Sequence, residues 1–199
     1  MGAEQSSLPP LLPPPADYDV LIIDGRSGSG KTSLAREAVA AAHLAELDPQ
    51  LLHVEDLYPG WDGLDAGSRA LPGVLERRQY RRYDWVAGAF GERVTLGPEL
   101  PLIIEGCGAL TVEALGAAQQ FAGPAARVIT LWLECPAPER QARALARDGE
   151  TYAPHWQRWA DQEDALYART RPWLIADRIV DHRVTEQGSV GDPLVRRVD

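Results

Sequence analysis

A single lysine behind a run of glycines is the feature of this 199-residue chain best suited to chemistry. Lys31 is the only lysine among 20 basic residues, and it completes the spacing G-x-x-x-x-G-K-[ST]. Glycines permit positive φ and leave space for a phosphate, so that backbone amides and a helix N-terminus can face it. We therefore expect a nucleotide-binding loop made of Gly25, Arg26, Ser27, Gly28, Ser29, Gly30, Lys31, Thr32 and Ser33.

The loop predicts ATP and magnesium as cofactors. Lys31 would reach the β- and γ-phosphates, and the Thr32 hydroxyl would bind Mg²⁺. Glu105 follows four apolar residues of the stretch PLIIEG, which places its carboxylate at the carboxyl edge of a sheet as a second metal ligand. The alternatives are a glycine turn with a capping threonine, and a strand-end charge that faces solvent.

Two adjacent carboxylates, Glu55 and Asp56, follow another short apolar stretch. Either could accept the proton of an acceptor hydroxyl, and Asp56 could also contribute to the Mg²⁺ site. The sequence leaves open which of the two is the base. The alternative is an acidic loop that caps a helix.

Arg140, Arg143 and Arg147 have the spacing i, i+3, i+7 and so share one face of a helix. We expect this face to bind ATP phosphates, with Arg140 and Arg143 contacting the nucleotide and Arg143 and Arg147 neutralising charge during phosphoryl transfer. The alternative is a solvated helix face paired with Glu139 and Asp148.

The segment 76–85 combines four arginines with aromatic residues, which is also typical of nucleic-acid-binding surfaces. A net charge of −9 argues against nucleic acid and anionic membranes as partners. A small phosphate acceptor fits better, and a solvated surface helix is the alternative. Trp156 and Trp159 are compatible with core packing or with a stacking platform, and His155 is interpreted as structural. The residues expected to contact the acceptor are Tyr58, Trp61, Arg78, Arg81 and Tyr83.

Short apolar segments alternate with helical ones, which predicts an α/β fold with a parallel sheet covered on both faces. The expected strands are 19–24, 51–54, 101–106, 127–134 and 175–181. The expected helices are 31–46, 111–121, 137–147 and 154–169. Residues 55–72 are expected to be a long functional loop. The division is a disordered proline-rich tail at 1–16, one domain at 17–182 and an extension at 183–199.

Location and assembly are predicted only in outline. No apolar run approaches the ~20 residues that span a bilayer. Cys107 and Cys135, without an export signal, indicate reduced thiols and a cytoplasmic protein. A monomer and a homo-oligomer both remain open.

Four stretches resemble the P-loop nucleoside and metabolite kinases, most closely the uridine kinase branch. They are IDGRSGSGKTSLA, EDLY, LIIEG, and Arg143 with Arg147-Asp148. The resemblance implies a three-layer α/β/α P-loop NTPase fold with five parallel strands in the order 2-3-1-4-5 and a helical lid. It also implies transfer of the γ-phosphoryl of ATP to a hydroxyl of a small molecule, with a nucleoside such as uridine or cytidine favoured. Glu55 stands where the family has its catalytic Asp. The rival hypothesis is a nucleotide-binding ATPase switch without an acceptor.

Overall fold

The computed structural model describes residues 11–181 and 194–197. In this part of the chain, six strands form the central sheet, in the order β2-β5-β1-β6-β7-β8. Five of these strands run parallel, and β8 pairs antiparallel with β7. Their bounds are Val20–Gly25 for β1, Gln50–His53 for β2, Leu102–Glu105 for β5, Val128–Glu134 for β6, Arg178–Asp181 for β7 and Leu194–Arg197 for β8.

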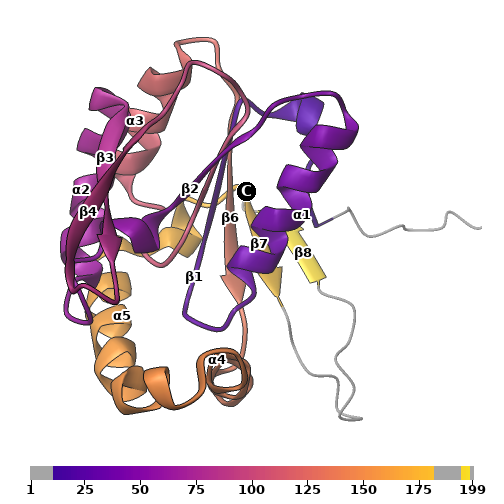
Figure 1. Ribbon diagram of the computed structural model, residues 1–199. Coiled ribbons are helices and arrows are strands. Elements are labelled where there is room, and N and C mark those ends of the chain that lie inside the picture. Colours follow the sequence, from indigo (N-terminus) through magenta and orange to yellow (C-terminus); the bar gives the residue numbers. More distant parts are fainter. Residues whose placement is uncertain (1–10, 182–193, 198–199) are drawn as a thin grey trace, which may run out of the picture.

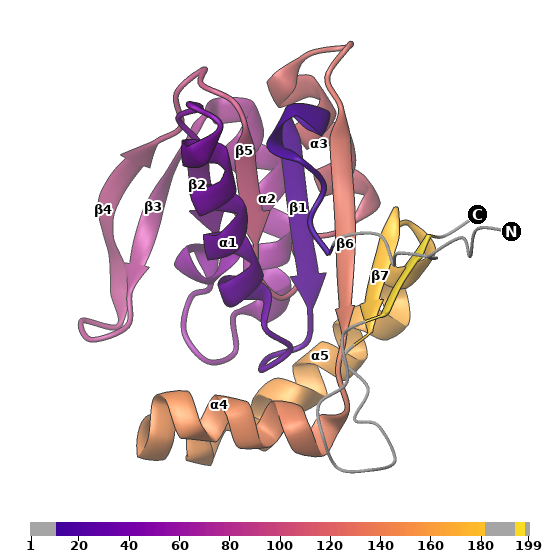
Figure 2. The same cartoon turned by 90° about the vertical axis from the view of Figure 1, so that its right-hand side faces the viewer.

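The sheet lies between two layers of helices because its central strand is apolar on both faces. Val20 and Ile22 of β1 belong to the core cluster shared with helices α2 and α3, whereas Leu21 and Ile23 belong to the cluster shared with α1. Side chains alternate between the two faces of a strand, so the unbroken run VLII fills both cores. The predicted three-layer α/β/α arrangement is confirmed, and Figure 2 shows α1 on one side of the sheet and α2 and α3 on the other.

Five helices accompany the sheet in the described residues (Figure 1). They are α1 Lys31–Leu44, α2 Leu64–Arg77, α3 Val112–Ala122, α4 Ala137–Tyr152 and α5 Trp156–Thr170. Short 3₁₀ turns are η1 Pro15–Asp17, η2 Val54–Leu57, η3 Ala153–His155 and η4 Pro172–Leu174. Helices α4 and α5 cross the edge of the sheet at which β1 and β6 end, which is the edge where parallel α/β sheets bind ligands (Figure 2).

The sheet differs from the prediction in the number of strands. When the five parallel strands are numbered along the chain, their order across the sheet is 2-3-1-4-5. The sixth strand, β8, extends the β7 edge and lies in the predicted extension 183–199. The prediction of five strands in an all-parallel sheet was therefore wrong, because β8 has only four residues, LVRR, whose apolar and charged residues do not alternate.

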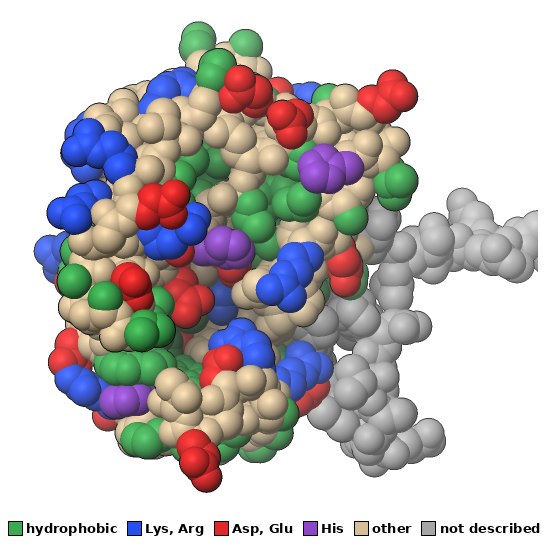
Figure 3. Space-filling view, viewed as in Figure 1, with side chains coloured by type: hydrophobic (Ala, Val, Ile, Leu, Met, Phe, Trp, Pro, Cys, Tyr) green, Lys and Arg blue, Asp and Glu red, His purple; other side chains and the backbone are tan. Residues whose placement is uncertain are grey.

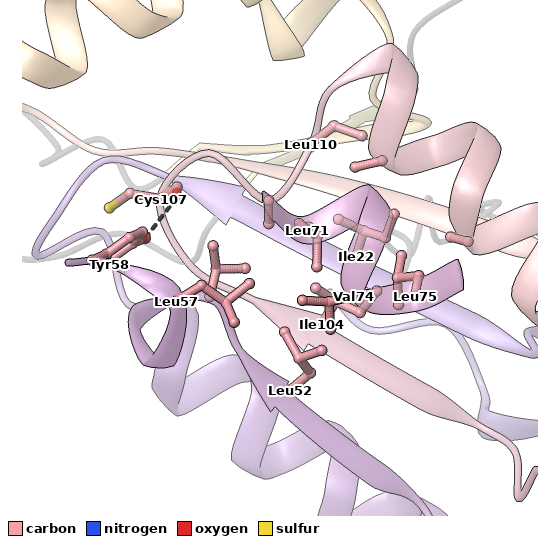
Figure 4. Packing of buried hydrophobic residues seen from close by; sticks show 14 of the residues in the cluster. Ile22, Leu52, Leu57, Tyr58, Leu71, Val74, Leu75, Ile104, Cys107 and Leu110 are labelled. Atoms are coloured by element: carbon pink, nitrogen blue, oxygen red, sulfur yellow. Dashed lines mark hydrogen bonds between the residues drawn. The ribbon is translucent and has the colours of Figure 1, made fainter. Parts of the chain in front are cut away.

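Helix α2 replaces half of the loop expected at 55–72. It contains Pro72, yet Leu71, Val74 and Leu75 on one side of it are buried. These side chains pack against Ile22 and Ile104 of the sheet (Figure 4). Burial of this apolar face outweighs the helix-breaking tendency of glycine and proline, at about 25 cal/mol for each Å² of apolar surface removed from water.

An antiparallel hairpin occupies much of the segment 76–85 and the residues after it. Strands β3 Gln79–Asp84 and β4 Ala89–Thr95 form a separate two-stranded sheet. The surface helix considered for this segment is therefore wrong, since the helical part ends at Arg77. Figure 2 shows the hairpin beside the β2 edge of the main sheet.

The described end of the proline-rich segment is packed rather than free. Leu11 and Leu12 contact the core cluster on the α1 side, and η1 forms at Pro15–Asp17. The predicted disordered tail at 1–16 is thus wrong for residues 11–16, where apolar side chains find a core. The remainder of the predicted tail, residues 1–10, lies outside the described residues. Within the described part of the chain, no helix has the length and apolar character needed to cross a membrane.

Candidate active site

The glycine-rich loop joins β1 to α1, as the motif predicts. Gly30 caps the N-terminus of α1 with φ +99°, and no side chain caps that end of the helix. The first-turn amides of the helix consequently remain available to an anion. Gly28, with φ +79°, lies so close to α4 that an added Cβ would be 2.1 Å from the Arg140 carbonyl oxygen. Glycine is required at this position by both conformation and space.

Several side chains hold the loop in place from α4 and α5. The Ser27 amide donates to Glu163 Oε1 at 2.5 Å, and the Ser27 hydroxyl accepts from Tyr152 at 2.9 Å. Arg140 donates to the Ser27 carbonyl at 3.1 Å and to the Cys135 carbonyl at 3.0 Å. These contacts connect helices α4 and α5 to the loop.

Asp24, at the end of β1, is a buried carboxylate behind the loop. It accepts hydrogen bonds from the Leu110 amide at 2.8 Å, the Gly108 amide at 3.0 Å and the Tyr167 hydroxyl at 2.8 Å. Burial raises the pKa of Asp24 to about 6, against the lowering effect of these hydrogen bonds. Asp24 therefore ties β1 to the segment after β5 and to α5.

Lys31 projects from the start of α1 into the site and is only 7% exposed. Its Nζ donates to the Arg26 carbonyl at 3.0 Å and lies 3.4 Å from Cys107 Sγ. Burial lowers the pKa of Lys31, but its acidic neighbours, first Cys107 and then Glu105, raise it overall, so the ammonium stays charged.

Thr32 and Glu105 meet at the point predicted for a metal. The Thr32 hydroxyl lies 3.2 Å from Glu105 Oε1, although 73 residues separate the two in the sequence. His53 Nδ1 lies 2.6 Å from the same carboxylate oxygen. Burial opposes ionisation of Glu105, but the His53 hydrogen bond and the Lys31 charge lower its pKa overall. A hydroxyl and an ionised carboxylate are hard oxygen donors, so this pair fits a magnesium ion.

Two cavities open on either side of the loop. The loop cavity, of roughly 1020 Å³ including space open to solvent, is lined by α1, the loop and α4; it contains Gly28, Gly30, Lys31, Thr32, Ser33, Arg143 and Arg147. The aromatic cleft, of roughly 580 Å³ counted in the same way, is lined by Ser27, Gly28, Lys31, Thr32, Glu55, Tyr58, Trp61, Trp85, Glu105, Gly106, Cys107, Arg147, Asp148, Tyr152 and Trp159. Figure 3 shows acidic and basic side chains gathered around a hollow on this face, next to hydrophobic ones.

Five aromatic side chains form the wall of the aromatic cleft. Trp61 is central to them: its ring stacks on Tyr152 with centroids 5.4 Å apart and lies 4.9 Å from Trp85. Its ring also stacks on His155 at 4.2 Å, which gives that histidine the structural role expected. Tyr58 is fixed by its hydroxyl, which donates to the Cys107 carbonyl at 2.7 Å (Figure 4).

The structure separates the two adjacent carboxylates. Glu55 lines the aromatic cleft, where burial raises its pKa and the Arg147 charge partly lowers it. Asp56 does not line the cleft: it accepts from the Tyr80 hydroxyl at 3.0 Å and from Arg82 Nε at 3.1 Å. The expectation that Asp56 serves as a base or metal ligand is not met, because its carboxylate is engaged with the hairpin.

The predicted acceptor contacts are also divided. Tyr58 and Trp61 line the aromatic cleft, but the three residues taken from the segment 76–85 do not. Arg78 donates to the carbonyls of Gly97 and Phe121, and Arg81 to those of Phe90 and Gly91. Tyr83 packs between Trp85 and Phe90. Arg81 and Tyr83 stabilise the hairpin and Arg78 connects its base to α3, so the structure does not bring these three side chains to the cleft as predicted.

Among the predicted nucleotide contacts, four residues line neither cavity. Gly25, Ser29 and Arg140 are buried in the structure that supports the loop, and Arg26 pairs with Asp164 at 2.7 Å and Glu163 at 3.7 Å. Arg143 lines the loop cavity, and Arg147 lines both cavities.

Sequence reasoning missed several residues of the site. They are His53, Trp85, Asp148, Tyr152 and Glu163. The signal for His53 was its place directly before the two carboxylates, at the end of a strand. Asp148 follows the predicted Arg147, and Trp85 ends the segment 76–85, but neither carried a signal of its own. Tyr152 and Glu163 are distant in sequence from the loop, so only the folded chain brings them to it.

The chain matches no protein-family model and no curated protein. Among solved structures it is similar to a possible uridine kinase from Bacillus stearothermophilus, with a TM-score of 0.53 and 20% identity over 81% of this chain and 88% of the other. A gluconokinase from Sinorhizobium meliloti 1021 is less similar, with a TM-score of 0.48 and 16% identity over 83% of each chain. At this level of identity the likeness shows that the chain shares its fold with the possible uridine kinase.

Proposed function

We propose that this protein is a Mg²⁺- and ATP-dependent kinase that transfers the γ-phosphoryl group to a hydroxyl of a small molecule. The observation that carries the proposal is the aromatic cleft, which contains Lys31 and Thr32 of the phosphate-binding loop, the carboxylate Glu55 and five aromatic rings. Phosphoryl transfer needs a phosphate site, a proton acceptor and an acceptor pocket within one enclosure.

The nucleotide would enter through the loop cavity. Its phosphates would accept hydrogen bonds from backbone amides of the loop and of the first turn of α1, and from the Lys31 ammonium. Arg143 and Arg147 of α4 line the same cavity and would neutralise charge on the transferring group. Bound at Thr32 and Glu105, magnesium would supply further positive charge to the phosphate oxygens.

Glu55 is the residue we assign as general base. It faces the cleft that contains the phosphate-binding lysine, whereas the Asp56 carboxylate bonds with Tyr80 and Arg82. Burial raises the pKa of Glu55, which makes its ionised carboxylate a stronger base. Glu55 would therefore take the role of the catalytic Asp that the resembling family has at this position.

The aromatic wall favours an acceptor with a flat or apolar face. A nucleoside such as uridine or cytidine fits because its base can stack on aromatic rings, and a solved structure that shares the fold is described as a possible uridine kinase. Other small hydroxyl compounds with such a face are also candidates. Rings from α4 and α5 and from the segment before α2 close the cleft and would exclude water from the transferring phosphoryl.

Release of ADP from Mg·ATP, measured with and without acceptors, tests the proposal. Uridine, cytidine, purine nucleosides, sugars and polyols would be added singly, and the phosphomonoester would be identified by mass spectrometry. We expect ADP and phosphomonoester in equal amounts, and a loss of several orders of magnitude in Lys31→Ala. ADP release that no acceptor stimulates would instead indicate the ATPase switch.

A further inference from the structure

The charged side chains of the aromatic cleft are unevenly matched. Three carboxylates line it, from Glu55, Glu105 and Asp148, against two cations, Lys31 and Arg147. Under the proposed function Glu105 holds magnesium, so Glu55 and Asp148 are the carboxylates that remain to face an acceptor. The whole chain carries a net charge of −9, so its long-range field adds to the repulsion of anions.

Both cations already have partners. Lys31 lies in the loop, bonded to the Arg26 carbonyl, and under the proposed function it serves the phosphates of ATP. Arg147 donates to Asp148 through Nε at 2.9 Å and through Nη2 at 2.6 Å. Among the described residues that line the cleft, no other cation is available for an acceptor.

Asp148 lies directly before a break in α4. Gly149 has φ +55° and ψ −135°, outside the helical region, so the helix bends after Asp148. Arg147 and Asp148, just before the bend, line the cleft, and Tyr152, after the bend, forms part of its aromatic wall. Under the proposed function Arg147 would turn toward a phosphate, which would leave the Asp148 carboxylate in the cleft without its cationic partner.

We propose that the aromatic cleft selects its acceptor by charge, taking uncharged or cationic hydroxyl compounds and rejecting those that bear a carboxylate or phosphate. Like charges brought together in a cleft disfavour binding, whereas aromatic faces and carboxylates tolerate or attract a cation. This inference rests on the proposed function and deepens it by naming the charge class of the acceptor.

The test uses acceptors that share a hydroxyl-bearing skeleton and differ in charge. One set is uridine, its carboxylate derivative orotidine, and the cation 3-methylcytidine. A second set is glycerol, glycerate and 3-aminopropane-1,2-diol. For each, kcat/KM with Mg·ATP would be measured in the wild type, in Asp148→Asn, and in Glu150→Gln. Glu150 is an exposed carboxylate on the same helix that does not line the cleft, so Glu150→Gln is the matched control.

We expect the anionic member of the active set to be at least about tenfold poorer than its neutral partner in the wild type and in Glu150→Gln, since roughly 1.4 kcal/mol corresponds to tenfold. Asp148→Asn should narrow that ratio by roughly tenfold. Equal use of the neutral and anionic members by the wild type would overturn the inference while leaving the kinase proposal intact. Absence of stimulation by these six compounds and by every acceptor of the screen described above would overturn both.

Discussion

His53 Nδ1 lies 2.6 Å from Oε1 of Glu105, and the two residues face each other in the register of β2 and β5. The hydrogen bond raises the pKa of His53 and contributes to lowering that of Glu105. It also fixes one carboxylate oxygen, while Thr32 lies 3.2 Å from the same group. Partners of this kind orient metal ligands in many proteins.

Replacement of His53 should weaken metal binding. In His53→Ala we expect about tenfold lower affinity for Mn²⁺ in the presence of ADP, because the Glu105 carboxylate loses its orientation. His53→Asn, which can still donate a hydrogen bond, should retain most of the affinity. Electron paramagnetic resonance titration of free Mn²⁺ measures this without catalysis. Unaltered affinity in His53→Ala would show that the histidine has no part in the metal site.

Substitutions of Glu55 and of Asp56 should have opposite effects on kcat and on stability. Glu55→Gln should lower kcat by about 10²–10⁴-fold with little change in stability, as expected for loss of a general base. Asp56→Asn should retain most of its kcat but lose roughly 1–2 kcal/mol of unfolding free energy, because Tyr80 and Arg82 lose an ionised acceptor. Single-turnover kinetics and urea unfolding measure the two effects. The reverse pattern would transfer the base to Asp56.

Asp24 should make the stability of the protein depend on pH. Its folded pKa of about 6 lies above the ordinary value of 3.8, so the folded state holds this proton more tightly than the unfolded state. The resulting stabilisation is present below pH 3.8 and is lost as pH rises through 6, by roughly 3 kcal/mol in total. Urea unfolding between pH 4 and pH 6.5 measures the slope.

Asp24→Asn is the matched variant for this slope. Asparagine does not titrate, so the decline attributed to position 24 should disappear whatever the absolute stability of the variant. A decline of the same steepness in Asp24→Asn would assign the titration to other groups.

Trp61 should link the end of α4 to acceptor binding and phosphoryl transfer in the aromatic cleft. Its stacking on Tyr152 and His155 joins the segment before α2 to the end of α4. In Trp61→Ala we expect about tenfold higher KM for the acceptor, corresponding to the roughly 1.5 kcal/mol of a ring pair, and more ADP released without acceptor. Trp173→Ala is the control, since Trp173 packs against Trp132 and lines neither cavity. An equal rise of uncoupled ADP release in both variants would assign the effect to general loosening.

The sequence predicted the parts of the site that a local pattern determines. Lys31, Thr32 and the glycines are adjacent in the chain, and their geometry follows from the strand, loop and helix around them. Glu105 was predicted because four apolar residues place it at the end of a buried strand. The meeting of Thr32 with Glu105 required only that β1 and β5 be neighbours.

The remaining parts depend on long-range packing. The choice between Glu55 and Asp56 is made by η2, whose short turn sends one carboxylate to the cleft and the other to the hairpin. The aromatic wall combines four separate segments of the chain. Helix α2 was missed because Gly67 and Pro72 indicate a loop, whereas its apolar spacing, read at 3.6 residues per turn, would have indicated a helix.

Calorimetric titration with Mg²⁺ and a non-hydrolysable ATP analogue tests the central claim most directly, because it asks whether the loop binds a nucleotide. We predict saturable binding by the wild type, weakened at least about tenfold in a Lys31→Ala variant with an unchanged circular dichroism spectrum, as expected when a charge-assisted contact to phosphate is lost. If the folded wild-type protein took up no nucleotide, both the kinase and the ATPase switch would be contradicted.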